Sequence, residues 1–373
     1  MKIGFLNDST NNEKRITLTP PNAKQLSDLG ATLLLEQGFE KQLFKKEDFS
    51  SYNSTSSDVI LKDSDIVIKL HPPKKEDLSA LKKGAIHISF LDPFNSKDIL
   101  DEAAKLGITL ISLEMIPRTT RAQKMDVLSS QASLAGYAAV LTGANRLEKV
   151  FPMMMTPAGT LAPTKVFIIG AGVAGLQAIA TARRLGARVE AFDTRPVVEE
   201  QVQSLGAKFV KVDLGDTGQT KDGYAKQLTE EQLAKQQEVM AKHCAMADLV
   251  ITTAQVFGRK APLIINKKMV NSMSKGSVIV DLAVETGGNV EGSETGKDVQ
   301  INGVTIVGVA NMPGEVALHA SQMLSANITH LLTEFWNKET KTFDLNLEDE
   351  ILAGCVMTHN GELVNERIKA HYG

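Results

Sequence analysis

The sequence predicts an α/β protein of two domains, each built around a mainly parallel β-sheet. With 373 residues, the chain is too long for one typical domain and long enough for two that each bury a core. Short apolar segments typical of strands alternate with helical segments, and this alternation indicates parallel strands joined by helices. The alternation occurs twice, once before residue 131 and again from about residue 165.

Each series has its own set of expected elements. In the first series we expect a helix at about 20–29 and strands at 2–6, 32–35, 66–69, 85–90 and 109–112. In the second we expect strands at 165–169, 188–192, 249–252 and 277–281, with helices ending near 185 and spanning 230–247. The segment 213–228 is glycine-rich and polar and reads as a long surface loop.

Two further helices determine how the domains are connected. Residues 131–150 are rich in Ala, Leu and Gly at helical spacing and predict a long helix that bridges the domains. Residues 316–336 have a similar pattern, and we expect this helix to return to the first domain. The second domain, 131–310, is therefore expected as an insertion in the first, which comprises 1–130 and 311–373.

The composition excludes several classes of function. A net charge of -3, with 43% hydrophobic and 23% charged residues, is ordinary for a soluble globular protein and offers no basic surface for nucleic acid or an anionic membrane. The two cysteines, Cys244 and Cys355, have no spacing typical of a disulfide framework or a zinc site. His243 lies beside Cys244 without a second ligand at helical spacing, so a structural role is expected and no metal site is predicted.

The location is expected to be cytoplasmic. The first residues lack the apolar core of an export signal. Residues 166–182 are uncharged, but they contain three glycines and fall short of a membrane span, so no direct membrane insertion is expected. The run Met153-Met154-Met155 is interpreted as adaptable core packing.

A glycine-rich turn is the strongest local motif. The apolar strand 166–169 is followed by Gly170-Ala171-Gly172-Val173-Ala174-Gly175, which opens a helix. In such a turn the first glycine permits the tight bend, the second admits a pyrophosphate to the backbone, and the third lets helix and strand pack closely. The context predicts a Rossmann-like dinucleotide site.

The next strand ends at Asp193, about 20 residues beyond the turn, where a carboxylate can bind the adenosine ribose. A 2′-phosphate would be repelled by this charge, so the position favours NAD over NADP. Arg195 lies two residues further and softens that repulsion. The structural alternative is a plain glycine turn with a capping aspartate.

A polar segment, 118–130, follows the strand 109–112, at the strand end where α/β proteins place active-site residues. Arg118, Gln123, Asp126 and Ser129 supply a cation, an amide, a carboxylate and a hydroxyl, which suit a carboxamide and a ribose. The alternative is that Asp126 or Ser129 only caps a helix.

Several motifs together resemble the NAD(H)-binding domain of proton-translocating transhydrogenases, a family whose fold is shared with alanine dehydrogenase. The resemblance covers nearly the whole chain. It rests on residues 118–137, including Gln123, Asp126, Ser129-Ser130 and Ala135-Gly136-Tyr137, and on 169–176, 191–196, 222–226 and 276–283.

The resemblance implies the residues that bind and position the cofactor. Arg118, Gln123 and Asp126 would surround the nicotinamide as the catalytic set, and Tyr224 would lie in a loop that closes over bound nucleotide. The cofactor-binding set implied is Arg118, Thr119, Thr120, Arg121, Ser129, Gly170, Gly172, Val173, Gly175, Asp193, Thr194, Arg195, Gly223, Tyr224 and Gln255. The sequence around Gln255, Gln255-Val256-Phe257-Gly258, departs from the usual Leu-Ile-Pro-Gly.

The resemblance also implies partners. The expected activity is that of a Si/Re-specific, proton-translocating NAD(P)⁺ transhydrogenase, in which this chain binds NAD and passes hydride to NADP on a separate NADP(H)-binding subunit. A membrane-spanning subunit would carry the protons, and the chain would lie peripherally on the inner face of the cytoplasmic membrane. A homodimer is implied, through the 131–150 helix and the Tyr224 region.

Two alternatives remain from the sequence. Arg15 and Lys69 resemble the residues with which alanine dehydrogenases grip pyruvate, but transhydrogenases keep them too. Where those dehydrogenases have a catalytic histidine, this chain reads Leu91-Asp92-Pro93, and neither His87, on an apolar strand, nor Glu285 is a clear substitute. The second alternative is a non-catalytic NAD-binding module.

Overall fold

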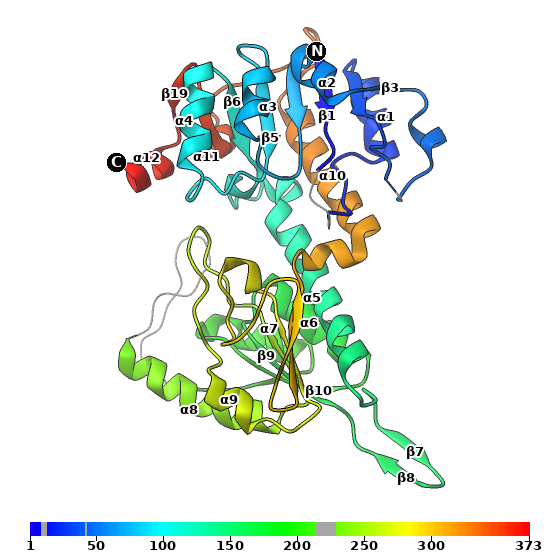
Figure 1. Ribbon diagram of the computed structural model, residues 1–373, viewed down its shortest axis with the longest axis vertical. Helices are drawn as coiled ribbons and strands as arrows, with labels where there is room; N and C mark the ends of the chain where they lie inside the picture. Colours follow the sequence, from blue (N-terminus) through cyan, green and yellow to red (C-terminus); the bar gives the residue numbers. More distant parts are fainter. Residues whose placement is uncertain (9–12, 42, 213–228) are drawn as a thin grey trace. The chain divides into compact units, whose positions relative to one another are not determined.

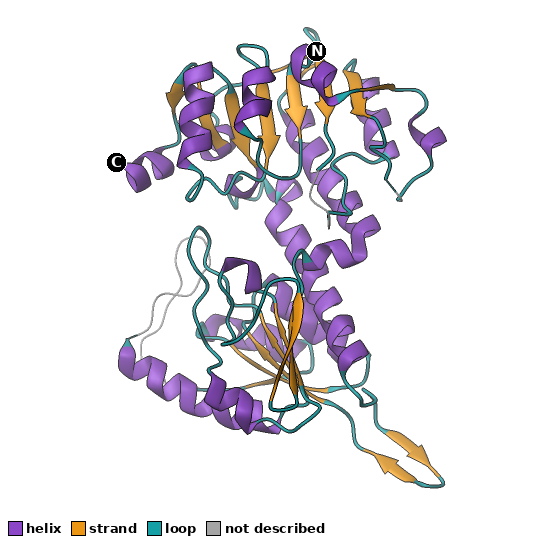
Figure 2. Cartoon of the chain, in the orientation of Figure 1, coloured by secondary structure: helices purple, strands orange, loops and turns teal. Residues whose placement is uncertain are grey.

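The structure is a computed structural model of the chain, and it describes residues 1–8, 13–41, 43–212 and 229–373. The chain divides into two compact units. Unit 1 comprises 1–131 and 316–373, and unit 2 comprises 132–315. The boundaries expected from the sequence, 130/131 and 310/311, lie one and five residues from these. Each unit contains its own sheet with helices against it (Figures 1 and 2).

The sheet of unit 1 contains eight strands in the order β19-β18-β6-β5-β4-β1-β2-β3. The six strands β1 to β6 pair in parallel, and their order reverses beside β1, as in a Rossmann fold. The C-terminal strands β18 and β19 extend the sheet in antiparallel fashion beside β6 and were not predicted. The strands are β1 (Lys2–Phe5), β2 (Thr32–Glu36), β3 (Asn53–Thr55), β4 (Ile66–Ile68), β5 (Ile86–Ser89), β6 (Thr109–Ser112), β18 (Val356–His359) and β19 (Glu362–Leu363).

The long helix α10 (Ala317–Glu334) belongs to unit 1 and packs against its N-terminal part. The buried hydroxyl of Ser321 accepts a hydrogen bond from Ile16 N at 3.0 Å, and that of Ser325 accepts one from Thr19 N at 2.9 Å. These contacts confirm that the helix returns to the first domain. The other helices of unit 1 are α1 (Pro20–Asp28), α2 (Ser57–Asp63), α3 (Lys75–Ala80), α4 (Lys97–Leu106), α11 (Glu350–Cys355) and α12 (Glu366–Tyr372).

The sheet of unit 2 has seven strands in the order β11-β10-β9-β12-β13-β15-β14, and only β14 is antiparallel to its neighbour. The direction in which strands are added reverses between β9 and β12, and ligands bind at the carboxyl ends of strands at such a point. The strands are β9 (Lys165–Ile169), β10 (Arg188–Phe192), β11 (Lys208–Phe209), β12 (Leu249–Thr252), β13 (Val278–Asp281), β14 (Lys297–Ile301) and β15 (Val304–Gly308).

Helices cover both faces of this sheet, as Figure 2 shows. Along β9, Val166 and Ile168 join one apolar cluster with residues of α6 (Val173–Arg184), while Phe167 and Ile169 join another with residues of α8 (Glu230–Met246). Successive side chains of a strand point to opposite faces, so a strand covered on both sides must be apolar throughout. The remaining helices here are α5 (Val127–Arg146), α7 (Glu199–Ser204) and α9 (Lys267–Ser272).

The methionine run is not core packing, and that interpretation was wrong. Met153, Met154 and Met155 are 58%, 42% and 79% exposed. They lie at the start of a two-stranded hairpin, β7 (Met154–Thr156) and β8 (Gly159–Leu161), which extends from the rest of unit 2 (Figure 1). A two-stranded hairpin by itself cannot bury the side chains on either of its faces.

The structural role expected for His243 and Cys244 is confirmed. His243 Nδ1 lies 2.6 Å from Glu190 Oε2, and its ring lies 5.3 Å from that of Phe167. Cys244 is fully buried, and burial raises the pKa of its thiol to about 12. Among the residues that the structure describes, no helix combines the length and the apolar character needed to cross a membrane.

His87 lies on β5 in the core of unit 1 and is 1% exposed, which confirms the interpretation of a buried histidine. Its Nε2 lies 3.1 Å from Ser89 Oγ, while the buried Nδ1 has no hydrogen-bond partner in the described part of the chain. Burial, together with the nearby ammonium of Lys69, lowers the pKa of His87 from 6.5 to about 3. His87 is therefore neutral in the folded protein at neutral pH.

We predict that His87 makes the protein sensitive to acid. Between pH 6.5 and about 3 the unfolded chain binds a proton at this residue that the folded chain does not, so acidification decreases the free energy of unfolding. Going from pH 7 to pH 5, His87→Gln should therefore lose about 2 kcal/mol less stability than the original protein. Urea unfolding at both pH values measures this, and exposed His319→Gln should keep the original dependence.

Candidate functional site

The polar segment after β6 leads directly into α5, and Asp126 begins that helix. Its carboxylate accepts a hydrogen bond from Ser129 N at 2.9 Å and lies 2.6 Å from Ser129 Oγ. Asp126 is thus an N-cap, the alternative that the sequence left open. Because of this cap the helix spans Val127–Arg146 and not the expected 131–150, and Ser129 lies in its first turn.

Most of the residues expected around the nicotinamide line one small hollow of unit 1, about 280 Å³ in volume. Its lining consists of Pro117, Arg118, Thr119, Thr120, Ala122, Gln123 and Asp126. The side chains of Arg118, Thr120 and Gln123 are exposed. Thr119 Oγ1 is buried without a hydrogen-bond partner in the described residues, so it is a group that a polar ligand would satisfy.

Arg121, also expected to bind cofactor, is engaged elsewhere. Its Nε donates to Glu334 Oε1 at 2.8 Å and its Nη2 to Asp349 Oδ2 at 2.5 Å. The guanidinium lies 5.6 Å from the ring of Phe335. Arg121 therefore ties the segment to the end of α10 and the start of α11, and it does not line the hollow.

The structure adds Asn327, on α10, which the sequence analysis did not single out. Its Nδ2 donates to Lys124 O at 2.7 Å, and its Oδ1 lies 2.7 Å from Ser130 Oγ. Asn327 is 8% exposed. The available signal was a polar residue in the middle of an otherwise apolar helical segment, which is costly to bury unless it is hydrogen-bonded.

The glycine turn of unit 2 has the geometry of a nucleotide-binding turn. Gly170 has a φ of +99°, which favours glycine, and its carbonyl accepts a hydrogen bond from Thr253 Oγ1 at 3.1 Å. A Cβ at Gly175 would lie 1.9 Å from Gly170 O, so only glycine permits this packing of helix on strand. A Cβ at Gly172 would approach only Arg195 Nη2, at 4.0 Å, among the described residues. Gly172 therefore leaves open space at the N-terminus of α6.

That helix N-terminus offers several groups to an anion. Gly172 is the N-cap of α6 and Val173 its first residue, with a side chain that is 43% exposed. The free backbone N–H groups of a helix's first turn bind phosphate oxygens, and the helix dipole favours the negative charge. The turn is thus suited to a pyrophosphate.

Asp193, at the end of β10, is already fully hydrogen-bonded. Its Oδ1 accepts from Arg195 N and Nε, at 2.8 and 2.9 Å, and its Oδ2 accepts from Ala171 N and Arg195 Nη2, at 2.8 and 2.7 Å. A carboxylate accepts about four hydrogen bonds. Ribose hydroxyls would therefore have to replace Arg195 as donors to this carboxylate.

The other residues expected near the nucleotide are less informative. Thr194 is partly buried beside Asp193. Gln255 is exposed on the loop after β12, and its Nε2 donates to Leu282 O at 2.8 Å. Gly223 and Tyr224 lie outside the described residues.

Buried Asp281 and Asn289, which the sequence analysis did not assign, organise the loops at this edge of the sheet. Asp281 Oδ1 accepts from Thr252 Oγ1 and Ala283 N, and Oδ2 accepts from Asn289 N. Asn289 Nδ2 in turn donates to Ala254 O at 2.8 Å. These bonds hold together the loops that follow β12 and β13, one of which carries Gln255.

The positions that resemble alanine dehydrogenase lie in unit 1. Arg15 is 8% exposed and donates from Nε and Nη2 to Glu13, at 2.9 and 2.8 Å, and from Nη1 to Gln131 Oε1 at 2.9 Å. Burial alone would raise the pKa of Glu13, but the hydrogen bonds from Arg15 and His71 hold it well below its usual range. Lys69 Nζ lies 3.4 Å from Asp77 Oδ2.

No imidazole occupies the position where alanine dehydrogenases carry their catalytic histidine. Asp92 stands there with an exposed side chain, whose oxygens accept from Asn95 Nδ2 at 2.9 and 3.1 Å. Its φ of +47° is held by buried Glu114, which accepts from Asp92 N at 2.6 Å. Glu285 accepts from Asn311 N at 3.0 Å, so it serves as a loop carboxylate.

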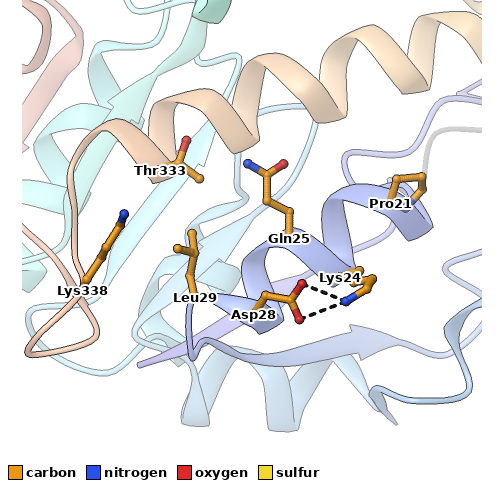
Figure 3. Close-up of a pocket in the computed structure, with 7 residues that line it drawn as sticks. All are labelled: Pro21, Lys24, Gln25, Asp28, Leu29, Thr333 and Lys338. Carbon is orange, nitrogen blue, oxygen red and sulfur yellow. Dashed lines mark hydrogen bonds and ion pairs between the residues drawn. The ribbon is translucent and has the colours of Figure 1, made fainter.

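A larger hollow in unit 1, of about 500 Å³, contains none of the predicted site residues. It is lined by Pro21, Lys24, Gln25, Asp28, Leu29, Thr333 and Lys338 (Figure 3). Lys24 Nζ is paired with Asp28 at 2.8 Å, and both side chains are more than 60% exposed. The charged groups of this hollow are therefore solvated and paired with each other, and they do not indicate a ligand.

The doubly wound sheet of unit 2, with its glycine turn at the point where the strand order reverses, defines a Rossmann-type dinucleotide-binding fold. The chain belongs to the alanine dehydrogenase/PNT family, whose N-terminal domain matches residues 4–135 and whose C-terminal domain matches residues 139–366.

Three known proteins illustrate the relationship. The chain is 41% identical to an NAD(P) transhydrogenase alpha subunit of Rhodospirillum rubrum, over 98% of both chains. The crystal structure of a transhydrogenase from Sinorhizobium meliloti matches with a TM-score of 0.85 and 37% identity, over 98% of this chain and all of that one. Alanine dehydrogenase of Mycolicibacterium smegmatis is more distant, at 26% identity over 99% of this chain and 96% of its own.

We predict that two alanine substitutions in the glycine turn separate nucleotide binding from folding. Gly172→Ala adds a methyl group where no described residue opposes it, so stability should be unchanged while NADH affinity falls about tenfold or more. Gly175→Ala forces the helix off the Gly170 carbonyl, so affinity should fall together with about 1–3 kcal/mol of stability. Calorimetric NADH titration and urea unfolding measure both effects. Unchanged NADH affinity in Gly172→Ala would contradict the assignment of the pyrophosphate to this turn.

Proposed function

We propose that this chain is the NAD(H)-binding component of a proton-translocating NAD(P)⁺ transhydrogenase, Si/Re-specific, which exchanges hydride with NADP(H) bound on a partner subunit. The observation that carries the proposal is the open glycine turn at Gly172, in a chain that resembles a transhydrogenase alpha subunit over almost its whole length. The family explains the turn, and the turn gives the family resemblance a physical function.

The residues present fit NAD. Gly172 leaves the space that a pyrophosphate requires, and the first turn of α6 supplies donors for it. Asp193 ends the neighbouring strand, where its carboxylate would bind the adenosine ribose and disfavour a 2′-phosphate. We assign Gly170, Gly172, Val173, Gly175, Asp193, Thr194 and Arg195 to this half of the cofactor, with Gly223, Tyr224 and Gln255 assigned from the resemblance.

The nicotinamide half is assigned to the segment before α5. Arg118, Gln123 and Asp126 would orient the ring, with Thr119, Thr120, Arg121 and Ser129 as further contacts. When bound, the nicotinamide supplies the hydride, and the protein supplies orientation and exclusion of water. Hydride exchange between two nicotinamides leaves no proton to remove, so no general base is required.

The remaining functions of the enzyme are assigned to partners. NADP is held by a separate NADP(H)-binding subunit, and a membrane-spanning subunit conducts the protons. The chain is then cytoplasmic and peripheral, bound to the inner face of the cytoplasmic membrane through these subunits. Neither nucleic acid nor direct membrane insertion is included in the proposal.

The main alternative is an alanine dehydrogenase. Oxidation of an amino acid requires a proton acceptor beside the hydride acceptor. At the position of the expected histidine, Asp92 is exposed and bound to Asn95, while His87 is buried and its pKa is lowered to about 3. These observations favour hydride exchange. A non-catalytic NAD-binding module is the second alternative.

One experiment separates the three functions. The purified chain is mixed with an NADP(H)-binding transhydrogenase component, and reduction of an NADP analogue by NADH is followed by absorbance. Transfer supports the proposal, and NADH binding without transfer supports a non-catalytic module. Turnover of pyruvate, ammonia and NADH by the chain alone would identify an alanine dehydrogenase.

Two substitutions test the nicotinamide assignment. Gln123→Ala and Asp126→Asn should slow single-turnover hydride transfer by roughly 10- to 100-fold, because misplaced rings lose the aligned geometry. NADH affinity should change much less. Asparagine caps helices as well as aspartate does, so Asp126→Asn keeps the start of α5, and circular dichroism should be unchanged. Normal transfer rates in both variants would reject a positioning role.

We also propose a homodimer, in which a second copy covers apolar side chains of unit 2. Tyr137 and Leu141 are 39% and 36% exposed on α5, and Met155 is 79% exposed on the hairpin. Exposed apolar side chains on a two-stranded hairpin are typical of an interaction surface. Met155→Glu should raise the dimer dissociation constant in sedimentation experiments. Val59→Glu, at a residue of α2 that is 42% exposed, should not, and equal effects would contradict this surface.

A further inference from the structure

Asn327 joins α10 to the segment that carries Gln123, Asp126 and Ser129. One amide group bridges the two ends of this segment, since its Nδ2 donates to Lys124 O and its Oδ1 lies 2.7 Å from Ser130 Oγ. Asp126 lies between these two attachment points, and its own bonds to Ser129 close the intervening turn. The segment is therefore held from inside by its cap and from outside by Asn327.

The orientation of the amide is determined by its neighbours. A backbone carbonyl such as Lys124 O can only accept hydrogen bonds, so the NH₂ group of Asn327 must face it, and the amide oxygen then faces the Ser130 hydroxyl. Neither leucine, which has no polar atom, nor aspartate, which has no donor, can make both contacts. Asparagine is thus specifically suited to this position.

Helix α10 is a firm base for such a contact. Ser321 and Ser325, on the same helix, are fully buried and bind the backbone of Ile16 and Thr19. Gln131 Nε2 donates to Ala320 O at 3.1 Å, which adds a further link between α10 and the beginning of α5. A residue that orients a site must itself be held by its surroundings, and Asn327 meets this condition.

We infer that Asn327 is a positioning residue for hydride transfer: by bridging Lys124 and Ser130, it holds Gln123 and Asp126 in the geometry that orients the nicotinamide. This inference rests on the proposed function. Asn327 touches neither cofactor nor reacting atoms, and it acts through the segment that it clamps.

The test uses Asn327→Leu, which removes both contacts, and Asn327→Asp, which places an oxygen against Lys124 O and keeps an acceptor for Ser130. Ser325→Ala is the matched control, because it removes an equally buried polar contact of α10 that leads to Thr19 and Asn22 instead. Each protein is studied as the full chain, well below its unfolding temperature. Amide hydrogen exchange of residues 124–130, NADH affinity and single-turnover transfer to an NADP(H)-binding component are measured.

For Asn327→Leu we expect amide exchange of residues 124–130 at least tenfold faster, transfer at least tenfold slower, and NADH affinity within about threefold of the original, because the glycine turn supplies most of the binding. Asn327→Asp should show the same pattern, while Ser325→Ala should leave exchange in the segment and the transfer rate unchanged. Unchanged exchange in both Asn327 variants, or faster exchange with a normal transfer rate, would overturn the inference. If the unaltered chain transfers no hydride, the proposed function fails, whereas the exchange data still decide whether Asn327 clamps the segment.

Discussion

The backbone contact between Gly175 and the Gly170 carbonyl is the constraint on which the nucleotide site depends. A side chain at Gly175 would lie 1.9 Å from that oxygen, so the contact exists only because Gly175 carries no Cβ. It brings the N-terminus of α6 against the end of β9, at the centre of the sheet where the strand order reverses. The positive end of the helix and the open space at Gly172 then coincide, and together they form a site suited to a pyrophosphate.

Asp193 and Arg195 complete this edge of the sheet in a way that the motif alone does not reveal. The carboxylate that would receive the ribose is bound on all sides by Arg195 and by Ala171 N. This arrangement stabilises a buried charge by pairing and hydrogen bonding. It also means that nucleotide binding would exchange one set of donors for another, since Arg195 must yield positions to the ribose.

In unit 1 the polar segment before α5 is shaped by its attachments to helices. Asp126 caps α5, Arg121 binds Glu334 and Asp349, and Asn327 bridges Lys124 and Ser130. Residues outside the hollow thus hold those that line it. The aspartate at position 92, where an amino-acid dehydrogenase has its histidine, gives this region a different chemistry, because it lacks the imidazole that would take up a proton.

Sequence periodicity was sufficient to predict the parallel strands, α10 and the glycine turn, because each depends on residues close together in the chain. It could not place β18, whose partner β6 lies more than 240 residues away. Methionines 153–155 have the composition of a core segment but lie exposed on a hairpin, and Asn327 acquires its role only where the fold brings it to Lys124 and Ser130. By itself, the sequence determined the fold class and the chemistry of the nucleotide turn. The tertiary structure decided which side chains are buried, paired or exposed, because those properties arise from contacts between distant segments of the chain.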